Sequence, residues 1–345
     1  LVVSAIKDAG NVLVSDSIQK ILINYLQVTA FAQKFPLRWP RFLEDLFEFQ
    51  GAISTIGEHL LNPDCLSTTR SAAELFYSKQ ATYAFAPFIA SVVAFVFWYL
   101  KGFCSGESFF SKRSQPTDTT IKDKCILTIG TVVYFMFPTL CTNAFSIFHC
   151  RTVAGQMYLA ADMEEPCYVG RHLYMVLLLG LSQLLTYVFG LPLLVLVFLR
   201  RNKLLGGGGL QKHTTIVRYG LFYGAYKEST YYWEIVLTAR KIMVVALSVF
   251  GPGLGTERQA QMVLAVLLVC ISLEIAGDPF KLFNDRFRIL GRLEIATLFV
   301  QWATMVRYYT ICCYCCAWIL TFCFICCCCC AWILTFCFIC CCCLI

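Results

Sequence analysis

Five long apolar runs decide what this chain can fold into. Each is long enough, or nearly so, to cross about 30 Å of hydrocarbon as a helix that rises about 1.5 Å per residue. The runs extend over residues 82–100, 125–148, 172–199, 232–250 and 261–276. A sixth begins at Leu293 and continues into a cysteine-rich tail. The pattern predicts an all-α, polytopic transmembrane helical bundle with five clear spans and a damaged sixth.

The composition argues against a soluble domain. The 345 residues are 59% hydrophobic and 14% charged, with a mean hydropathy of +0.68, whereas soluble domains carry about 25% charged residues. The net charge of +7 lies in short loops between the apolar runs, which argues for a bilayer and against nucleic acid as a partner. No His-x-x-x-His or Gly-x-Ser-x-Gly pattern occurs. We therefore expect no enzyme, no cofactor and no metal site.

The basic residues predict which loops face the cytoplasm, because Lys and Arg are retained on that side during insertion. With residues 101–124, 200–231 and 277–292 cytoplasmic, fifteen Lys and Arg residues fall inside and three fall outside. The fifteen are Lys101, Lys112, Arg113, Lys122, Lys124, Arg200, Arg201, Lys203, Lys212, Arg218, Lys227, Lys281, Arg286, Arg288 and Arg292, and the three are Arg151, Arg171 and Arg258. A thiol probe should reach position 160 from outside and miss position 115. We expect a multi-pass protein of the plasma membrane or another cellular membrane.

The one substantial outer loop, residues 149–171, contains two cysteines. Cys150 and Cys167 both lie in this loop, and the outer compartment permits oxidation. We expect a disulfide between them, and the alternative is two free thiols.

Both ends of the chain differ from its apolar centre, residues 81–306, which we assign to the transmembrane domain. Residues 1–80 are expected to be a juxtamembrane segment, non-cytoplasmic or interfacial, that lacks the true N-terminus. A span hidden within 18–34 stays open. Residues 307–345 contain the fourteen letters CAWILTFCFICCCC twice in tandem, which we interpret as a non-native, low-complexity tail.

Ionisable residues at membrane depth are the candidate functional residues, because charges are costly there and usually face a cavity or a partner. Glu234, Arg240 and Lys241 lie in the fourth run, Glu274 near the end of the fifth, and Glu294 at the start of the sixth. In one interpretation, Arg240 or Lys241 pairs with Glu274 or Glu294 in a network that couples helix movement to gating. In the other, both cations snorkel to the cytoplasmic interface.

Three aromatic residues precede these charges where the chain re-enters the membrane. They are Tyr231, Tyr232 and Trp233. Tyr and Trp rings favour the membrane–water interface, so we expect these residues to fix the depth of the fourth span.

Five stretches resemble one family of membrane regions. They are KILINYLQV at 20–28, FPLRWP at 35–40, FHCRTVAGQMYLAADMEEPC at 148–167, VRYGLFYGAYKESTYYWEIVLTARK at 217–241 and DPFKLFNDRFRILGRLEIATL at 278–298. Over roughly residues 18–305 the chain resembles the TRP-like (transient receptor potential) C-terminal channel region of large algal, ciliate and oomycete surface proteins. The resemblance implies a channel for cations and a cysteine-rich ectodomain upstream. The repeat tail departs from the family's pattern.

Three functions stay open. The first is a TRP-like cation channel or channel-like subunit, assembled from several copies of the chain, which the intramembrane charges and the resemblance favour. The second is a membrane anchor or receptor region for an upstream cysteine-rich ectodomain, which suits the outer cysteine pair. The third is a transporter, in which Pro192 of the long third run would mark a broken helix.

Overall fold

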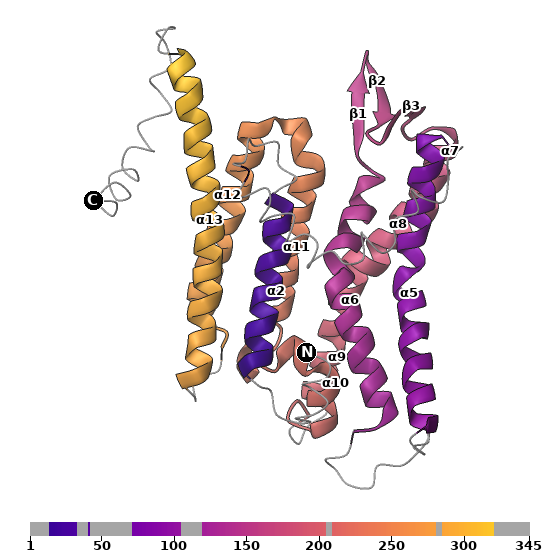
Figure 1. Cartoon of the computed structure of the whole chain (residues 1–345), viewed down its shortest axis with the longest axis vertical. Helices are drawn as coiled ribbons and strands as arrows, with labels where there is room; N and C mark the ends of the chain where they lie inside the picture. The colour runs from indigo at the N-terminus through magenta and orange to yellow at the C-terminus, as the bar shows by residue number, and fades with distance from the viewer. Residues whose placement is uncertain are drawn as a thin grey trace, which may run out of the picture. The chain divides into compact units, whose positions relative to one another are not determined.

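The described part of the chain includes six helices that are long and apolar enough to cross a membrane (Figure 1). The computed structural model describes residues 14–32, 41, 71–104, 119–204, 209–280 and 285–320. The six helices are Ala72–Cys104, Ile121–Ser146, Gly170–Leu204, Trp233–Leu254, Thr256–Gly277 and Ile289–Val306. The predicted all-α polytopic bundle is thereby confirmed.

The chain divides into two compact units, Leu1–Ala303 and Thr304–Ile345. In the second unit, the described part is the continuation of helix α13 (Asp285–Leu320). The sixth membrane-competent segment ends at Val306, ahead of the tandem repeat. Most of the repeat lies outside the described residues, so the interpretation of the tail remains a prediction.

Helices α5 (Ala72–Cys104) and α6 (Ile121–Ser146) pack side by side (Figure 1). A capping box starts α6: the Thr120 hydroxyl accepts the Asp123 N–H, and the Asp123 carboxylate accepts the Thr120 N–H at 3.0 Å. These bonds satisfy backbone donors that have no partner inside the helix. Asp123 is fully buried and also accepts a hydrogen bond of 2.6 Å from Arg218 Nε. That ion pair ties α10 (His213–Tyr223) to the start of α6.

The third span is one continuous helix that contains two π-helical segments. It runs through α7 (Gly170–Met175), η2 (Val176–Gly180), α8 (Leu181–Gln183), η3 (Leu184–Gly190) and α9 (Leu191–Leu204). A proline clashes with the carbonyl four residues before it, and the wider turn of η3 lies just where Pro192 needs space. The helix therefore continues through Pro192, instead of breaking there as the transporter interpretation supposed.

The fourth and fifth spans form a helical hairpin. It consists of α11 (Trp233–Phe250), the short η5 (Gly251–Leu254) and α12 (Thr256–Gly277), and α11 is preceded by η4 (Glu228–Thr230). Gly255 joins η5 to α12 with φ +90°, a conformation that favours glycine. Asp278 ends α12 in the left-handed region, at φ +34°, as is usual at helix C-termini.

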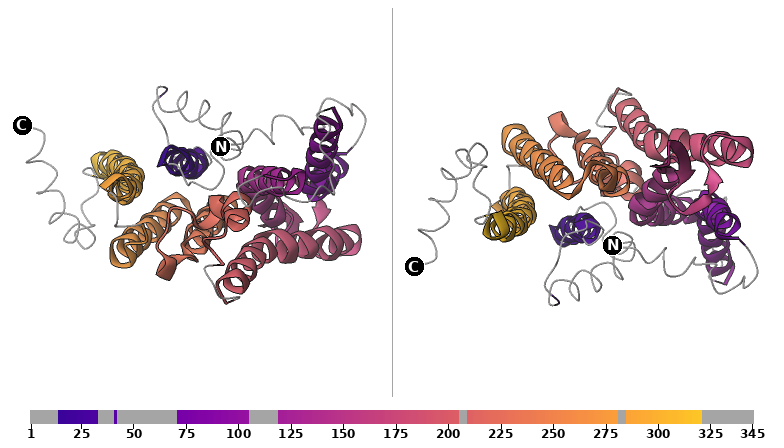
Figure 2. Two further views of the ribbon diagram at one scale, coloured as in Figure 1. Left: turned by 90° about the horizontal axis from the view of Figure 1, so that it is seen from below. Right: turned by 90° about the horizontal axis from the view of Figure 1, so that it is seen from above.

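Helix α2 (Val14–Ala32) joins this bundle with its polar side inward. It packs along α11 (Figures 1 and 2). Lys20, Asn24 and Gln27 are buried, whereas Ile18 and Leu22 are 40% and 52% exposed. The same helix also buries Ile21, Val28 and Phe31, so its inward side carries a polar row among apolar residues. The rest of the predicted 1–80 segment lies outside the described residues, apart from Arg41 and residues 71–80.

A three-stranded antiparallel sheet, which we call the outer sheet, occupies the loop predicted to lie outside. The all-α prediction did not include it. Its strands are β1 (Cys150–Val153), β2 (Gln156–Leu159) and β3 (Asp162–Pro166), in the order β1-β2-β3. Val153 faces Gln156 across a two-residue turn. Ala154 and Gly155 form the turn, with φ of +49° and +83°, as two-residue hairpins require.

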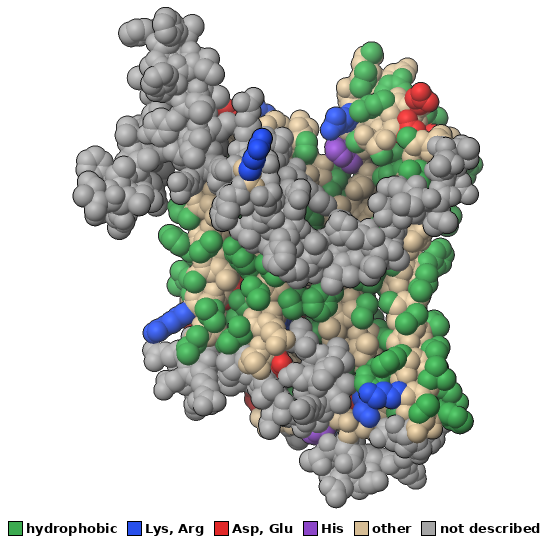
Figure 3. Space-filling model, viewed as in Figure 1, with side chains coloured by type: hydrophobic (Ala, Val, Ile, Leu, Met, Phe, Trp, Pro, Cys, Tyr) green, Lys and Arg blue, Asp and Glu red, His purple; other side chains and the backbone are tan. Residues whose placement is uncertain are grey.

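The side of α5 that faces away from the bundle is apolar over most of its length. Phe85, Phe88, Val92, Val93 and Phe97 are all more than half exposed. In Figure 3, hydrophobic side chains follow α5 down the right of the view. A soluble monomer rarely exposes so long an apolar strip, so this side of α5 is suited to contact lipid.

Candidate functional site: a buried charge layer

Six charged side chains of α2, α11, α12 and α13 form a buried layer, and the sequence analysis singled out five of them. They are Lys20, Glu234, Arg240, Lys241, Glu274 and Glu294, each at most 6% exposed. Three carry positive and three carry negative formal charge, so the layer is neutral as a whole. Buried charges are tolerated at membrane depth when they compensate one another in this way.

Arg240 and Glu294 form the ion pair between α11 and α13. Arg240 Nη2 donates to Glu294 Oε1 at 2.9 Å, and both side chains are almost completely buried. In the described part of the chain, Arg240 Nε and Glu274 Oε1 have no hydrogen-bond partner. The structure therefore brings Arg240 to Glu294, one of the two carboxylates proposed for it.

Glu274 is held by Trp233 instead of by a cation. Trp233 Nε1 donates to Glu274 Oε2 at 3.0 Å, and the indole is only 6% exposed. The Trp233 indole therefore faces a buried carboxylate of the neighbouring helix, and the interfacial depth expected for this residue stays a prediction. Tyr232 is 42% exposed, and Tyr231 is half-buried with Lys203 Nζ 4.4 Å from its ring centroid. An anchoring role remains available to these two tyrosines.

Lys20 is the partner of Glu234, and sequence reasoning missed it. Lys20 Nζ lies 2.5 Å from Glu234 Oε2, which also accepts the Tyr226 hydroxyl at 3.0 Å. Lys20 Nζ donates a second bond, of 2.6 Å, to the Leu221 carbonyl. The signal was the helical spacing of Lys20, Asn24 and Gln27, which puts polar groups on one face of an otherwise apolar stretch.

Lys241 fits neither interpretation proposed for it. Its Nζ lies 4.2 Å from the centroid of the Tyr134 ring, and no described carboxylate lies within 4.0 Å of it. Its 3% exposure shows that the ammonium does not reach the surface. The Tyr134 hydroxyl donates to Asn24 Oδ1, so the ring is fixed in place. Lys241 is thus a buried cation held by a cation–π contact.

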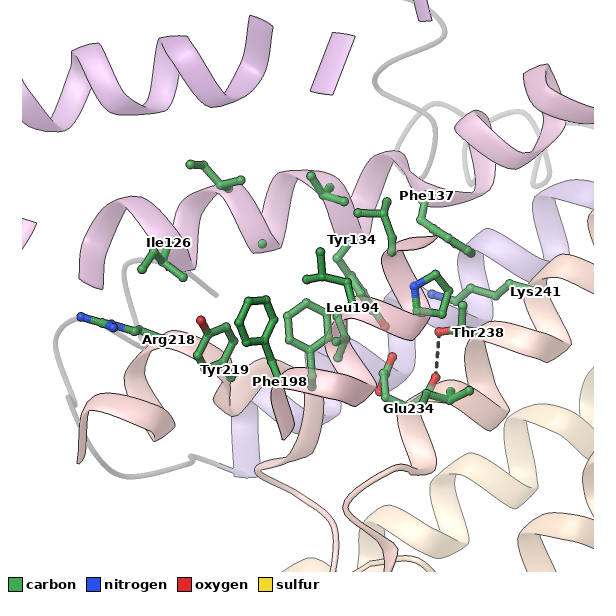
Figure 4. Close-up of a pocket in the computed structure, with 18 residues that line it drawn as sticks. Ile126, Tyr134, Phe137, Leu194, Phe198, Arg218, Tyr219, Glu234, Thr238 and Lys241 are labelled. Carbon is green, nitrogen blue, oxygen red and sulfur yellow. Dashed lines mark hydrogen bonds between the residues drawn. The ribbon is translucent and has the colours of Figure 1, made fainter. Parts of the chain in front are cut away.

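A cavity of about 300 Å³ lies beside Lys241 (Figure 4). Side chains of α6, α9, α10 and α11 line it, and most of them are aliphatic or aromatic. Glu234, Thr238 and Lys241 lie toward one end in Figure 4, and Arg218 lies toward the other, with the rings of Tyr219 and Phe198 between. The cavity is thus an apolar space with charged groups near its ends.

The predicted disulfide between Cys150 and Cys167 is confirmed. The Cα atoms are 6.4 Å apart, within the usual range for such bonds. His172 lies next to it, fully buried, where its Nδ1 accepts the Tyr168 N–H at 2.9 Å and its Nε2 donates to the Ile147 carbonyl at 3.1 Å. The two sulfurs are bonded to each other and both ring nitrogens are engaged. The cluster of Cys150, Cys167 and His172 is therefore structural.

The outer sheet is fastened to the start of α5. Asp162 Oδ2 accepts the Ala73 N–H at 2.8 Å, in the first turn of that helix. Glu165 accepts hydrogen bonds from Arg171 Nη2 at 2.8 Å and from the Tyr77 hydroxyl at 3.3 Å. The bonds from Arg171 are the main reason that the pKa of Glu165 lies below its usual value. A lowered carboxyl pKa means that this pair stabilises the fold above the pKa of the unfolded state and weakens as the pH falls through the folded-state pKa.

Replacing both Cys150 and Cys167 by serine is expected to speed protease cleavage of the outer sheet. The disulfide joins residues 17 apart in sequence, and the loop-entropy model assigns about 3 kcal/mol to such a closure. That free energy corresponds to roughly a hundredfold rise in the opened population. Limited proteolysis of intact membranes measures the rate. The control is Cys104→Ser, because Cys104 is an exposed free cysteine. Equal cleavage of the double variant and the unchanged protein would contradict the prediction.

Gly277→Ala is expected to lower the free energy of unfolding by about 1–3 kcal/mol, the usual cost of overpacking. A Cβ at Gly277 would lie 2.0 Å from Trp233 Cη2, so the indole must move and its bond to Glu274 is lost. Unfolding in detergent measures the change. The matched control is Gly253→Ala, whose added Cβ meets nothing within 4 Å. The prediction fails if the two variants are equally stable.

Comparison with known proteins finds one distant curated relative. No protein-family model matches the chain, and no solved structure matches it. The chain is similar to Cysteine repeat modular protein A of Toxoplasma gondii, with 24% identity over 212 residues. The match covers 58% of this chain and 6% of that protein. The chain therefore corresponds to a small part of a much longer relative.

Proposed function

We propose that this chain is the membrane-embedded domain of a larger surface protein and that it anchors a cysteine-rich extracellular part. Two observations together carry the proposal. The chain has six helices that could cross a membrane, and the region it matches is only 6% of a much longer relative. The name of that relative describes cysteine repeats. A multi-pass bundle attached to a long cysteine-rich chain is what an anchor or receptor of this kind requires.

The outer sheet supports the anchoring role. Its disulfide favours an oxidising compartment, and Asp162, Glu165 and Arg171 fasten it to the start of α5. The start of α5 is therefore joined to a cross-linked sheet, in part by charge-assisted bonds. Such a junction transmits force or movement from outside to the helices better than a loose loop does.

Protease treatment of intact source cells tests the anchor. An antibody against the outer sheet, residues 150–166, should detect a polypeptide much larger than the 39.0 kDa of this chain. External protease should then release a soluble cysteine-rich fragment and leave the helices in the membrane. If the antibody detects only a polypeptide near 39.0 kDa, the proposal is wrong.

A cation channel is the second candidate, favoured by the buried polar side of α2. Asn24 Nδ2, Gln27 Oε1 and Gln301 Oε1 are buried without a hydrogen-bond partner among the described residues. Buried polar atoms of this kind are usually met by ordered water. A hydrated strip beside a layer of paired charges is typical of ion pathways in membranes.

Ion flux into liposomes that contain the purified protein separates the two candidates. The channel predicts cation flux that falls when Asn24 and Gln27 are replaced by leucine, because an apolar strip excludes water. Leu22→Ala is the control, since Leu22 lies on the exposed side of the same helix. Flux no greater than that of empty liposomes would exclude the channel and leave the anchor standing.

A further inference from the structure

A buried cation that no described carboxylate contacts lines the cavity between α6, α9, α10 and α11. Lys241 is 3% exposed, and its ammonium contacts the face of Tyr134. A cation–π contact compensates a buried ammonium less completely than a carboxylate does. Because Lys241 also lines the cavity, an anion that enters the cavity can reach it.

The other charges that line the cavity are already neutralised. Glu234 pairs with Lys20 at 2.5 Å, and Arg218 pairs with Asp123 at 2.6 Å. Lys241 is therefore the charge on the cavity wall that has no ion-pair partner among the described residues. A ligand with one negative charge would supply the contact partner that Lys241 lacks.

The remaining wall determines the rest of the ligand. Ile129, Val133, Leu194, Val195 and Phe198 are among the apolar residues that form it. The volume of about 300 Å³ is at the small end of ligand pockets. A wall of this kind offers hydrogen bonds to few polar groups, so the uncharged part of the ligand must be apolar and slender.

We propose that the cavity binds a single-chain fatty acid. Its carboxylate lies at Lys241 Nζ, and its hydrocarbon chain runs along α6 and α9 toward Tyr219 and Phe198. A phospholipid tail would fill the apolar wall but would leave Lys241 uncompensated, and a soluble anion would pair with Lys241 but leave the apolar wall unfilled. The fatty acid meets both requirements at once.

Titration of the purified protein in lipid nanodiscs with radiolabelled lauric acid tests the site. The unchanged protein should bind the acid saturably, and Lys241→Met should weaken binding roughly tenfold or more, the loss of one charge-assisted hydrogen bond. The methyl ester of the probe should bind weakly and equally to both proteins. Lys101→Met, an exposed lysine of α5, is the matched control and should bind like the unchanged protein. Equal affinity of the acid for all three proteins would overturn the proposal.

A cavity-filling variant and a photolabel keep the test independent of Lys241. Gly130 lines the cavity, and a Cβ there meets only Phe222, at 3.6 Å or more. Gly130→Leu should therefore fill the cavity and abolish saturable binding of acid and ester. A diazirine-bearing fatty acid should label residues 126–137 and 191–198 of the unchanged protein. Labelling confined to the exposed face of α5 would show that the acid only partitions into lipid, and the proposal would fall.

Discussion

Replacing Arg240 by methionine is expected to lower the free energy of unfolding of the bundle by about 3–5 kcal/mol, the usual cost of breaking a buried ion pair. The methionine leaves the carboxylate of Glu294 buried without its partner, and Glu294 is only 1% exposed. The loss should separate α13 from α11, because this pair is the charged contact between them. Chemical unfolding in mixed micelles measures the change.

The double variant Arg240→Met and Glu294→Leu tests the reason for that effect. Removing both charges leaves no stranded ion, and apolar replacements of buried pairs are often neutral. The double variant should therefore cost clearly less than the sum of the single variants. Met243→Ala is the control, since Met243 lies on α11 and is 40% exposed. Strictly additive costs would show that Arg240 and Glu294 act independently.

Lys20→Met is expected to have a similar effect, about 3–5 kcal/mol, and to loosen α2 from the bundle. Glu234 would lose the ammonium at 2.5 Å and keep only the Tyr226 hydroxyl at 3.0 Å. The Leu221 carbonyl would lose its bond as well. Hydrogen exchange of the α2 amides, followed by mass spectrometry, measures the loosening.

Two further variants make the Lys20 result specific. Lys20→Met combined with Glu234→Gln should recover part of the stability, because the buried negative charge is gone. Ile18→Ala should leave α2 protected, because Ile18 lies on the exposed side of the helix. If α2 exchanges equally in Lys20→Met and the unchanged protein, the ion pair does not hold the helix.

The spans could be predicted because each depends on its own stretch of sequence. An apolar run of the right length must be a helix in hydrocarbon, since its backbone bonds cannot be made to water. The predicted runs at 125–148 and 232–250 therefore agree closely with α6 and α11. The first membrane-competent helix, α5, begins at Ala72, ten residues before the predicted run. Its first turns contact the outer sheet and need not be apolar.

Helix α2 and the strands of the outer sheet were harder to predict from the sequence. Lys20, Asn24 and Gln27 lower the average hydropathy of α2. These polar side chains are buried because neighbouring helices cover them. The strands of the sheet are only four or five residues long. The disulfide between Cys150 and Cys167 stabilises them, and this contribution leaves no periodic pattern of apolar residues in the sequence. Both elements depend on tertiary contacts.

The site was predicted as a set of residues more successfully than as a set of pairs. Charges at membrane depth stand out in any sequence, so Glu234, Arg240, Lys241, Glu274 and Glu294 were identified. Which cation meets which carboxylate depends on helix rotation, and rotation directs Arg240 to Glu294 while Lys241 turns toward Tyr134. Rotation also directs the Trp233 indole to Glu274, a contact that the sequence analysis did not predict.

Thiol labelling of intact cells tests the membrane-spanning arrangement most directly. A cysteine is introduced at Ala161, in the exposed turn between β2 and β3, or at Gln211, which is exposed before α10. A membrane-impermeant maleimide is then located on each introduced cysteine by mass spectrometry. The arrangement predicts labelling of Ala161→Cys in intact cells, and of Gln211→Cys only after the membrane is permeabilised. Labelling of both positions in intact cells, or of Gln211→Cys alone, would contradict it.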